Sequence, residues 1–161
     1  MATTSVRTAT ARRIMELLAT DGDLAGVAVR YGFPRDGLAG IGTDATIYVR
    51  VGEDGGNTNT HMKAGRKPRD DQWEILVTVA QSAYDDDENG LTLAERIETL
   101  FAQVENLFAD NPTLQKDGAG ISGLDWAVIS GESDGPIITP ADQGNFVGWW
   151  STTVTCRARL S

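Results

Sequence analysis

Two stretches of the chain place apolar residues three and four positions apart, which is the spacing of a helix with one apolar face. The first covers residues 5–19, and Asp21-Gly22-Asp23 follows it with residues that stop a helix. The sequence therefore predicts a first helix over this stretch. Its apolar positions are Val6, Ala9, Ile14, Leu17 and Leu18.

The second stretch, over residues 93–111, carries the strongest periodic signal in the sequence. Thr92 and Glu95 match a capping box, in which a hydroxyl and a carboxylate accept hydrogen bonds from free backbone N–H groups at a helix start. Asn111-Pro112 ends the pattern, because a residue before proline disfavours the helical conformation. We expect a long second helix with an apolar stripe of Leu93, Ile97, Leu100, Phe101, Val104, Leu107 and Phe108.

Other segments alternate apolar and polar residues, and this period of two predicts strands. One of them, residues 72–80, is apolar on both faces and is expected to be a central strand. The five predicted strands cover residues 26–33, 46–51, 72–80, 124–129 and 147–160.

Two stretches have the glycine, proline and polar residues of connections. Residues 131–145 are rich in glycine and proline, and we expect them to form a connection without regular structure. Residues 52–71 contain Gly55-Gly56 and are predicted to be a long mobile loop, since loops of this length are usually functional or flexible.

The predicted order of elements is α-β-β-β-α-β-β, which indicates an α+β fold. A chain of 161 residues has the length of one domain and can bury a sizeable core, so we expect one domain over residues 1–161.

The last predicted strand has two unlike faces. One face is apolar and includes Trp150 and Cys156, whereas the other is polar but begins with Trp149. If the second helix packs on the Trp150 face, Trp149 needs cover from the first helix or from another subunit. A simpler alternative is a closed core with one helix on each face and no assembly.

Composition excludes several classes of function. The chain has 14 basic and 23 acidic residues and a net charge of −9, which disfavours binding to free nucleic acid. It has one cysteine and one histidine, so no disulfide framework or multi-histidine metal site is expected. It lacks an apolar run of membrane-spanning length and an apolar leader, and we expect a soluble protein made in the cytoplasm.

No constellation of residues predicts catalysis, a cofactor or a metal. Asp85-Asp86-Asp87-Glu88 could hold a hard cation, but consecutive acidic residues are more typical of a solvated turn. His61 lies among polar loop residues with nothing nearby to orient it as a base. Cys156 lies on an apolar strand face, where a thiol usually acts as a small hydrophobic group.

A basic cluster, Lys63, Arg66, Lys67 and Arg69, falls within the predicted loop. It could contact DNA or an acidic partner, or it could be a solvated loop. The cluster has no aromatic residues between its charges, and single-stranded nucleic acid binding would use such residues to stack bases.

Four segments together have the pattern of a known family. They are the opening helix through Ile14 that leads into Val27-Ala-Val-Arg-Tyr-Gly, the strand Trp73-Glu-Ile-Leu-Val-Thr-Val, the helix ending in Asn111-Pro-Thr-Leu, and Gly148-Trp-Trp with the final strand. In this order the chain resembles the tail terminator proteins of long-tailed bacteriophages, which cap the tail tube beneath the head-tail connector. The likeness spans nearly the whole chain. The loop at 52–71 and the acidic run match no position of the family.

The resemblance implies a mixed, mainly antiparallel sheet of about five strands flanked by two main helices. It also implies a homohexameric ring in the virion, with no enzymatic activity and no cofactor, that stops tube growth and docks the tail to the head. The partners would be further copies of the chain, the tail tube protein and the head-tail connector or stopper protein, while DNA passes through the lumen without specific binding. Our candidate interface residues are Trp149, Lys63, Arg66, Lys67, Arg69, Arg157 and Arg159.

Two other interpretations stay open from the sequence. The chain could be another neck component, such as a head-tail joining protein, or a tube-like subunit. It could instead be a small-molecule-binding α+β domain with a pocket near Trp73, Trp126 or Trp150.

Overall fold

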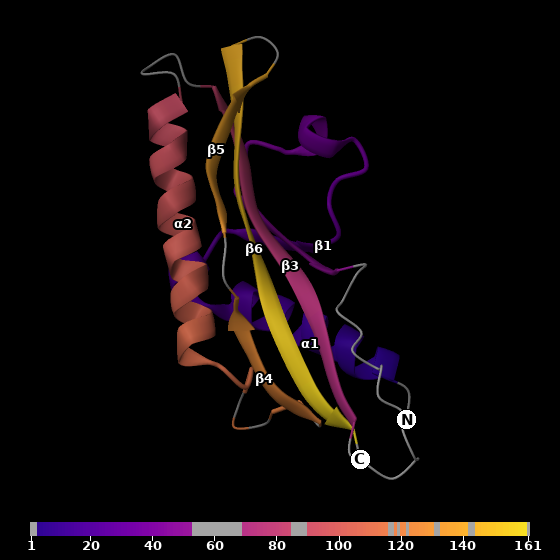
Figure 1. Cartoon of the computed structure of the whole chain (residues 1–161). Helices are drawn as coiled ribbons and strands as arrows, with labels where there is room; N and C mark the ends of the chain where they lie inside the picture. The colour runs from indigo at the N-terminus through magenta and orange to yellow at the C-terminus, as the bar shows by residue number, and fades with distance from the viewer. Residues whose placement is uncertain are drawn as a thin grey trace.

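A computed structural model describes the fold of most of the chain. It covers residues 3–52, 69–84, 90–115, 118, 120–121, 123–130, 133–141 and 144–160. Two α-helices and a mixed sheet make up this part of the chain (Figure 1). The helices are α1 (Thr3–Thr20) and α2 (Leu91–Asp110), and short 3₁₀ turns are η1 (Gly22–Leu24) and η2 (Gly37–Gly40). The strands are β1 (Ala28–Tyr31), β2 (Thr46–Val51), β3 (Arg69–Tyr84), β4 (Leu124–Ile129), β5 (Asp134–Pro140) and β6 (Asn145–Leu160).

The described strands form one six-stranded sheet in the order β1-β2-β3-β6-β4, with β5 also paired to β6. The β1–β2 pair is parallel, and all the other pairs are antiparallel. β3 and β6 pair along their full length, from Arg69 opposite Leu160 to Tyr84 opposite Asn145. The predicted α+β class, the mainly antiparallel sheet and the element order are confirmed, and β3 occupies the expected central place.

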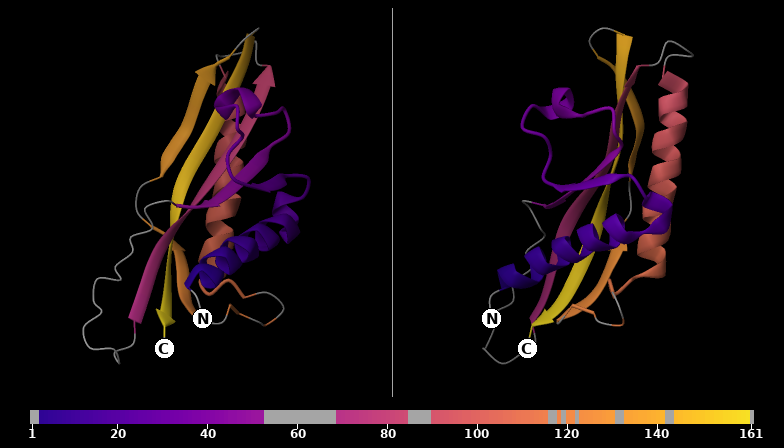
Figure 2. Two further views of the ribbon diagram at one scale, coloured as in Figure 1. Left: turned by 90° about the vertical axis from the view of Figure 1, so that its right-hand side faces the viewer. Right: turned by 180° about the vertical axis from the view of Figure 1, so that it is seen from behind.

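Both helices pack on the same face of the sheet, and this corrects the expectation that the first helix might cover the opposite face. α1 lies across β1 and β2, while α2 lies along β3, β6 and β5 (Figure 2). One continuous core joins both helices to alternate residues of the strands, because side chains on every second strand position face the same way. Its fully buried large side chains include Trp73, Phe101, Ile14, Leu18, Ile75 and Ile97.

The loop 111–115 that follows α2 is tied to α1. Leu114 is only 1% exposed and has a φ of +53°, which places its side chain in the core at a backbone conformation that leucine rarely adopts. The guanidinium Nη1 of Arg13 in α1 donates to the carbonyl oxygen of Leu114 at 2.8 Å. This bond and the burial of the leucine side chain together hold the two helices against each other.

β5 was not expected, because Pro136 and Pro140 interrupt the pattern of residues 131–145. A proline cannot donate to a sheet ladder and is tolerated on an edge strand. β5 is such an edge strand, since β6 is the strand it pairs with in the described sheet. The stretch expected to be an irregular connection therefore supplies the sixth strand.

Two other boundaries differ from the sequence expectation. β3 begins at Arg69, so the last three residues of the predicted loop at 52–71 belong to a strand. The predicted capping box is wrong: α2 begins two residues earlier, with Gly90 as its N-cap, a φ of +90° there and no side-chain capping bond. The close approach of Ile138 and Phe146 at Gly90 explains why this position has no side chain.

The contact between α2 and β6 centres on two stacked rings. The Phe101 and Trp150 rings are nearly parallel, at 4° between planes and 4.5 Å between centroids. Gly135 of β5 also lies close to the Trp150 indole, where a Cβ would fall 2.7 Å from the Cδ2 atom. The indole is thus in contact with both α2 and the backbone of β5.

We expect Gly135→Ala to destabilise the fold by about 1–3 kcal/mol, because the added methyl group must displace the rigid indole. Urea denaturation followed by circular dichroism would measure the loss. The matched control is Gly22→Ala, since a Cβ at Gly22 meets no atom within 4 Å and should change stability by less than about 0.5 kcal/mol. Equal stability of the two variants would contradict this account of the Trp150 contact.

Candidate assembly surface

The face of the sheet opposite the helices carries the candidate assembly surface. Trp149, Ser151, Thr153, Thr155 and Arg157 of β6 alternate with the buried residues of the core and lie on this face. In the described structure neither α-helix covers it, whereas the segment between β1 and β2, with η2, lies beside its upper part (Figure 1). We call this surface the open face.

At its upper end, the open face has a second, small apolar cluster. Ile41 from the β1–β2 connection packs with Tyr48, Ala80 and Val147, and Trp149 is partly buried against them. Ile137 of β5 stands directly across the strand pair from Trp149 and is 37% exposed. Trp149 and Ile137 therefore form an apolar edge that the described chain covers only in part.

The middle of the open face is lined by hydroxyl groups that bond one another. The Thr78 and Ser151 hydroxyl oxygens are 3.0 Å apart across β3 and β6, and the Thr155 hydroxyl donates to the Ser130 hydroxyl oxygen at 2.6 Å. These groups already have hydrogen-bond partners, so covering them would cost less than covering isolated polar groups.

The lower end of the open face combines a charge pair with apolar residues of β4. The Nε atom of Arg157 lies 4.0 Å from Oδ2 of Asp125. Trp126 is the register partner of Arg157, and Val128 is 38% exposed two residues further along β4. Arg157 is thus held on the open face by its own chain.

The predicted interface residues do not come together at one point. Trp149 and Arg157 share the open face but are eight residues apart on β6, which is about 26 Å at 3.3 Å per residue. The backbones of Arg69 and Arg159 lie at the far end of the β3–β6 pair, next to Leu160 and Asp70 respectively. Lys63, Arg66 and Lys67 lie outside the described residues.

Sequence reasoning missed two contributors to this surface, Ile137 and Val128. Ile137 was missed because its strand was taken as a connection. Val128 lies in a predicted strand, but the alternation of that strand does not show which of its faces meets the helices. In the structure, a shift in register between Leu124 and Trp126 determines which residues of β4 face the helices.

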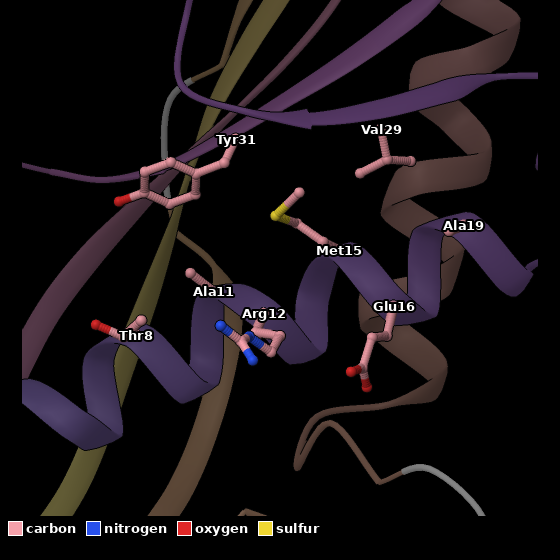
Figure 3. A pocket seen from close by; sticks show the side chains of 8 residues that line it. All are labelled: Thr8, Ala11, Arg12, Met15, Glu16, Ala19, Val29 and Tyr31. Atoms are coloured by element: carbon pink, nitrogen blue, oxygen red, sulfur yellow. The ribbon is translucent and has the colours of Figure 1, made fainter.

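A second surface is a groove of about 590 Å³ between α1 and β1. Figure 3 shows Met15 of α1 reaching toward Val29 and Tyr31 of β1, with Arg12 and Glu16 along the helix. Most of the lining is apolar, and Tyr31 is 59% exposed at its end. We call this feature the α1–β1 groove.

The only cysteine is part of the core and not of either surface. Cys156 is fully buried on β6 beneath the helices, and this burial raises the pKa of its thiol from 9.0 to about 12. A thiol that stays protonated at neutral pH is a poor nucleophile. Cys156 therefore acts as a packing residue, as expected from its place on the apolar face of the last strand.

Other candidate chemistry is placed only in part. Among the described residues, no group of three histidine, cysteine, aspartate or glutamate side chains is arranged to hold a metal ion. His61 and the acidic run 85–88 lie outside this part of the chain. No described helix has the length and apolar character needed to cross a membrane.

Comparison with known proteins gives a weak structural likeness. No family model and no curated protein matches the chain. A solved structure that carries no functional name aligns with 97% of this chain and 96% of its own, at 17% identity and a TM-score of 0.46.

The raised pKa of Cys156 predicts a pH dependence of stability. The folded state keeps the thiol protonated up to about pH 12, whereas the unfolded thiol loses its proton near pH 9.0, so its contribution to stability is complete below pH 9 and is lost as the pH rises toward 12. Over that range the free energy of unfolding of the wild type should fall more steeply than that of Cys156→Ala, by up to about 1.4 kcal/mol per pH unit.

Urea titrations of both proteins at several pH values would measure the two slopes. Because all other groups titrate equally in the wild type and in Cys156→Ala, the difference between the two slopes reports the ionisation of the Cys156 thiol alone. Parallel slopes would show that Cys156 ionises in the folded protein as readily as in the unfolded one.

Proposed function

We propose that this chain is a structural virion protein, a subunit of a ring that caps the tail tube of a long-tailed bacteriophage. The ring would stop tube polymerisation and dock the tail to the head connector. The observation that most supports assembly is the partly covered apolar edge of Trp149 and Ile137 on a sheet face that the described helices leave open. Large apolar side chains left at a surface usually mark a contact with another protein.

Elementary symmetry supplies the mechanism. Copies that meet head to tail form a closed ring when the rotation between neighbours divides a full turn, and such a ring can seat on a tube of the same symmetry. One side of the ring would bind the last tube layer and prevent addition of another. The other side would present a surface to the connector or stopper protein.

The charge of the chain suits a passage for DNA. With a net charge of −9, the protein has an overall field that repels phosphate, so DNA would move through a lumen without specific binding. Another neck or tube component would also benefit from a negative charge around the DNA passage. A terminator differs from such a component in its partner, because it must bind the growing end of the tube and block it.

The alternative of a small-molecule site gains no specific support from the three tryptophans that suggested it. Trp73 is fully buried in the core, with the Arg7 guanidinium 5.8 Å from its ring centroid, and Trp150 is stacked on Phe101. Trp126 lies on the open face beside Arg157. We therefore retain assembly as the proposed function.

Trp149→Ser tests the assembly surface. We expect the variant to stay folded as a monomer but to lose self-association, because Trp149 sits at the edge of a small cluster and not in the main core. Sedimentation velocity would measure the assembly, and circular dichroism would measure the fold. A variant that still forms the wild-type ring would show that Trp149 is not at the contact.

Trp150→Ser is the matched control, one residue away on the same strand. It removes the ring that stacks on Phe101 and should destabilise the fold by about 3–5 kcal/mol.

The terminator role has a separate test. Adding the wild type to polymerising tube protein should cap the tubes at a length set by the ratio of the two proteins. Tubes of unchanged length, with no bound protein at their ends, would reject the terminator role.

A further inference from the structure

The two edges of the sheet differ in their protection against pairing with a further strand. At the edge formed by β4 and β5, which we call the β4–β5 edge, Pro136 and Pro140 lack N–H groups, and the Ala127 N–H donates to the carbonyl oxygen of Pro112 at 2.8 Å. Prolines and covering loops are common means by which sheets block strand addition. The opposite edge of the described sheet is β1, which has no such protection along its middle.

The middle of β1 has backbone groups that point away from the sheet. The Gly32 N–H donates to the carbonyl oxygen of Val49 in β2 at 2.9 Å, and the Ala28 N–H donates on the same side at 3.1 Å. Successive residues of a strand direct their backbone groups to opposite sides, so the N–H and C=O groups of Val29 and Tyr31 face outward. In the described part of the chain, neither of these two N–H groups has a backbone acceptor.

Bonds within the chain limit this free stretch at both ends. Before it, the Val27 N–H donates to the carbonyl oxygen of Leu24 in η1 at 3.1 Å. After it, the Tyr31 hydroxyl oxygen accepts the Val51 N–H of β2 at 3.3 Å, beyond the end of β1. The outward groups of Val29 and Tyr31 therefore form a short gap in an edge that is otherwise satisfied.

The α1–β1 groove lies beside this gap. Val29 and Tyr31 turn their side chains toward α1, and no described residue of β2 lines the groove, so the groove lies on the outer side of β1 (Figure 3). A further strand would lie here, about 4.8 Å from β1. The opposite wall is one stripe of α1, formed by Thr8, Ala11, Met15 and Ala19.

The backbone groups and the groove together select an extended segment as the occupant. We propose that the β1 edge binds a short extended segment of a different protein, which adds to the sheet as a strand and directs alternate apolar side chains into the α1–β1 groove. The outward groups of Val29 and Tyr31 need a partner with free N–H and C=O groups, and a helix uses these groups internally. Arg12 and Glu16 at the rim carry opposite charges, so the hydrogen bonds and apolar contacts provide the selection.

A second copy of the chain has no suitable strand at its described edges. Its β4–β5 edge is blocked against pairing. Its β1 is accompanied by its own α1, and two paired β1 strands would bring both α1 helices into the same space beside the strands. The inference goes beyond the proposed function, which assigns contact between copies to the open face and leaves the β1 edge available to another protein.

Amide hydrogen exchange, resolved by residue, tests the site with peptide probes. The probes come from a displayed library of short peptides with apolar residues at alternate positions, and a library of the same composition in a non-alternating order is the control. We expect binders from the first library only. With the best of them bound, the Val29 and Tyr31 N–H groups should exchange at least about tenfold more slowly. The Arg30 N–H, which points toward β2, should change much less.

A pair of lysine variants tests the groove. Met15→Lys places a charge in the groove and should weaken binding of the selected peptide by about tenfold or more, because an apolar contact is replaced by a charge that must lose water. Leu38→Lys makes the same change at an exposed residue of η2 outside the groove and should bind as the wild type does. Fluorescence anisotropy would measure binding, and circular dichroism would check the fold of both variants.

Three results would overturn the proposal. They are the absence of any binder from the alternating library, a bound peptide that leaves Val29 and Tyr31 unprotected, and equal weakening by the two lysine variants. Protection of the same N–H groups when the wild type self-associates without peptide would also overturn it, because a second copy would then occupy the edge. If the peptide binds as expected but the wild type forms no ring alone or with tube protein, this inference stands and the proposed function is wrong.

Discussion

The pairing of β3 with β6 is the constraint on which the rest of the described structure depends. Sixteen consecutive register pairs join the two strands, and they span about 50 Å. β2 pairs along the outer side of β3, while β4 and β5 share the outer side of β6. Since strand side chains alternate, this one register decides which residues of both strands face the helices and which face away.

The consequence is clearest at the two adjacent tryptophans of β6. Trp150 faces the helices and stacks on Phe101, whereas Trp149 faces the other way and is covered only by a small cluster around Ile41. Both helices lie on one side, so the sheet has a packed face and an open face. A one-residue slip of β6 would exchange the two tryptophans and bury a row of serine and threonine hydroxyls under the helices. The long pairing with β3 makes that slip costly.

The described part of the chain has one sheet edge that is blocked against another protein and two apolar surfaces where another protein could bind. The β4–β5 edge is blocked by prolines and by the Pro112 carbonyl, while the open face and the α1–β1 groove present apolar side chains. The two apolar surfaces lie on different sides of the sheet, because the groove belongs to the helical layer and the open face does not. A subunit with two separate contact surfaces can bind a neighbouring copy with one and a different protein with the other.

Local sequence determined the elements whose stability comes from their own pattern. The stripe of α2, the end of α1 before Asp21 and the strand 46–51 were all predicted, because their periodicity shows directly which residues must be buried. The apolar nature of both faces of residues 72–80 was enough to place β3 in the middle of the sheet. Trp149 was also identified correctly as lying on the face away from Trp150.

Only the tertiary structure decided the features that depend on contacts between distant segments. β5 forms because the backbone of β6 has free hydrogen-bonding groups with which it can pair, although Pro136 and Pro140 disfavour a strand in the local sequence. α2 begins at Leu91, and its N-cap is Gly90, a position that Ile138 and Phe146 of two other strands approach too closely for a side chain. Periodicity shows that a helix has an apolar face but not which side of a sheet it will cover, so the packing of both helices on one face, and the open face that results, could not be read from the sequence.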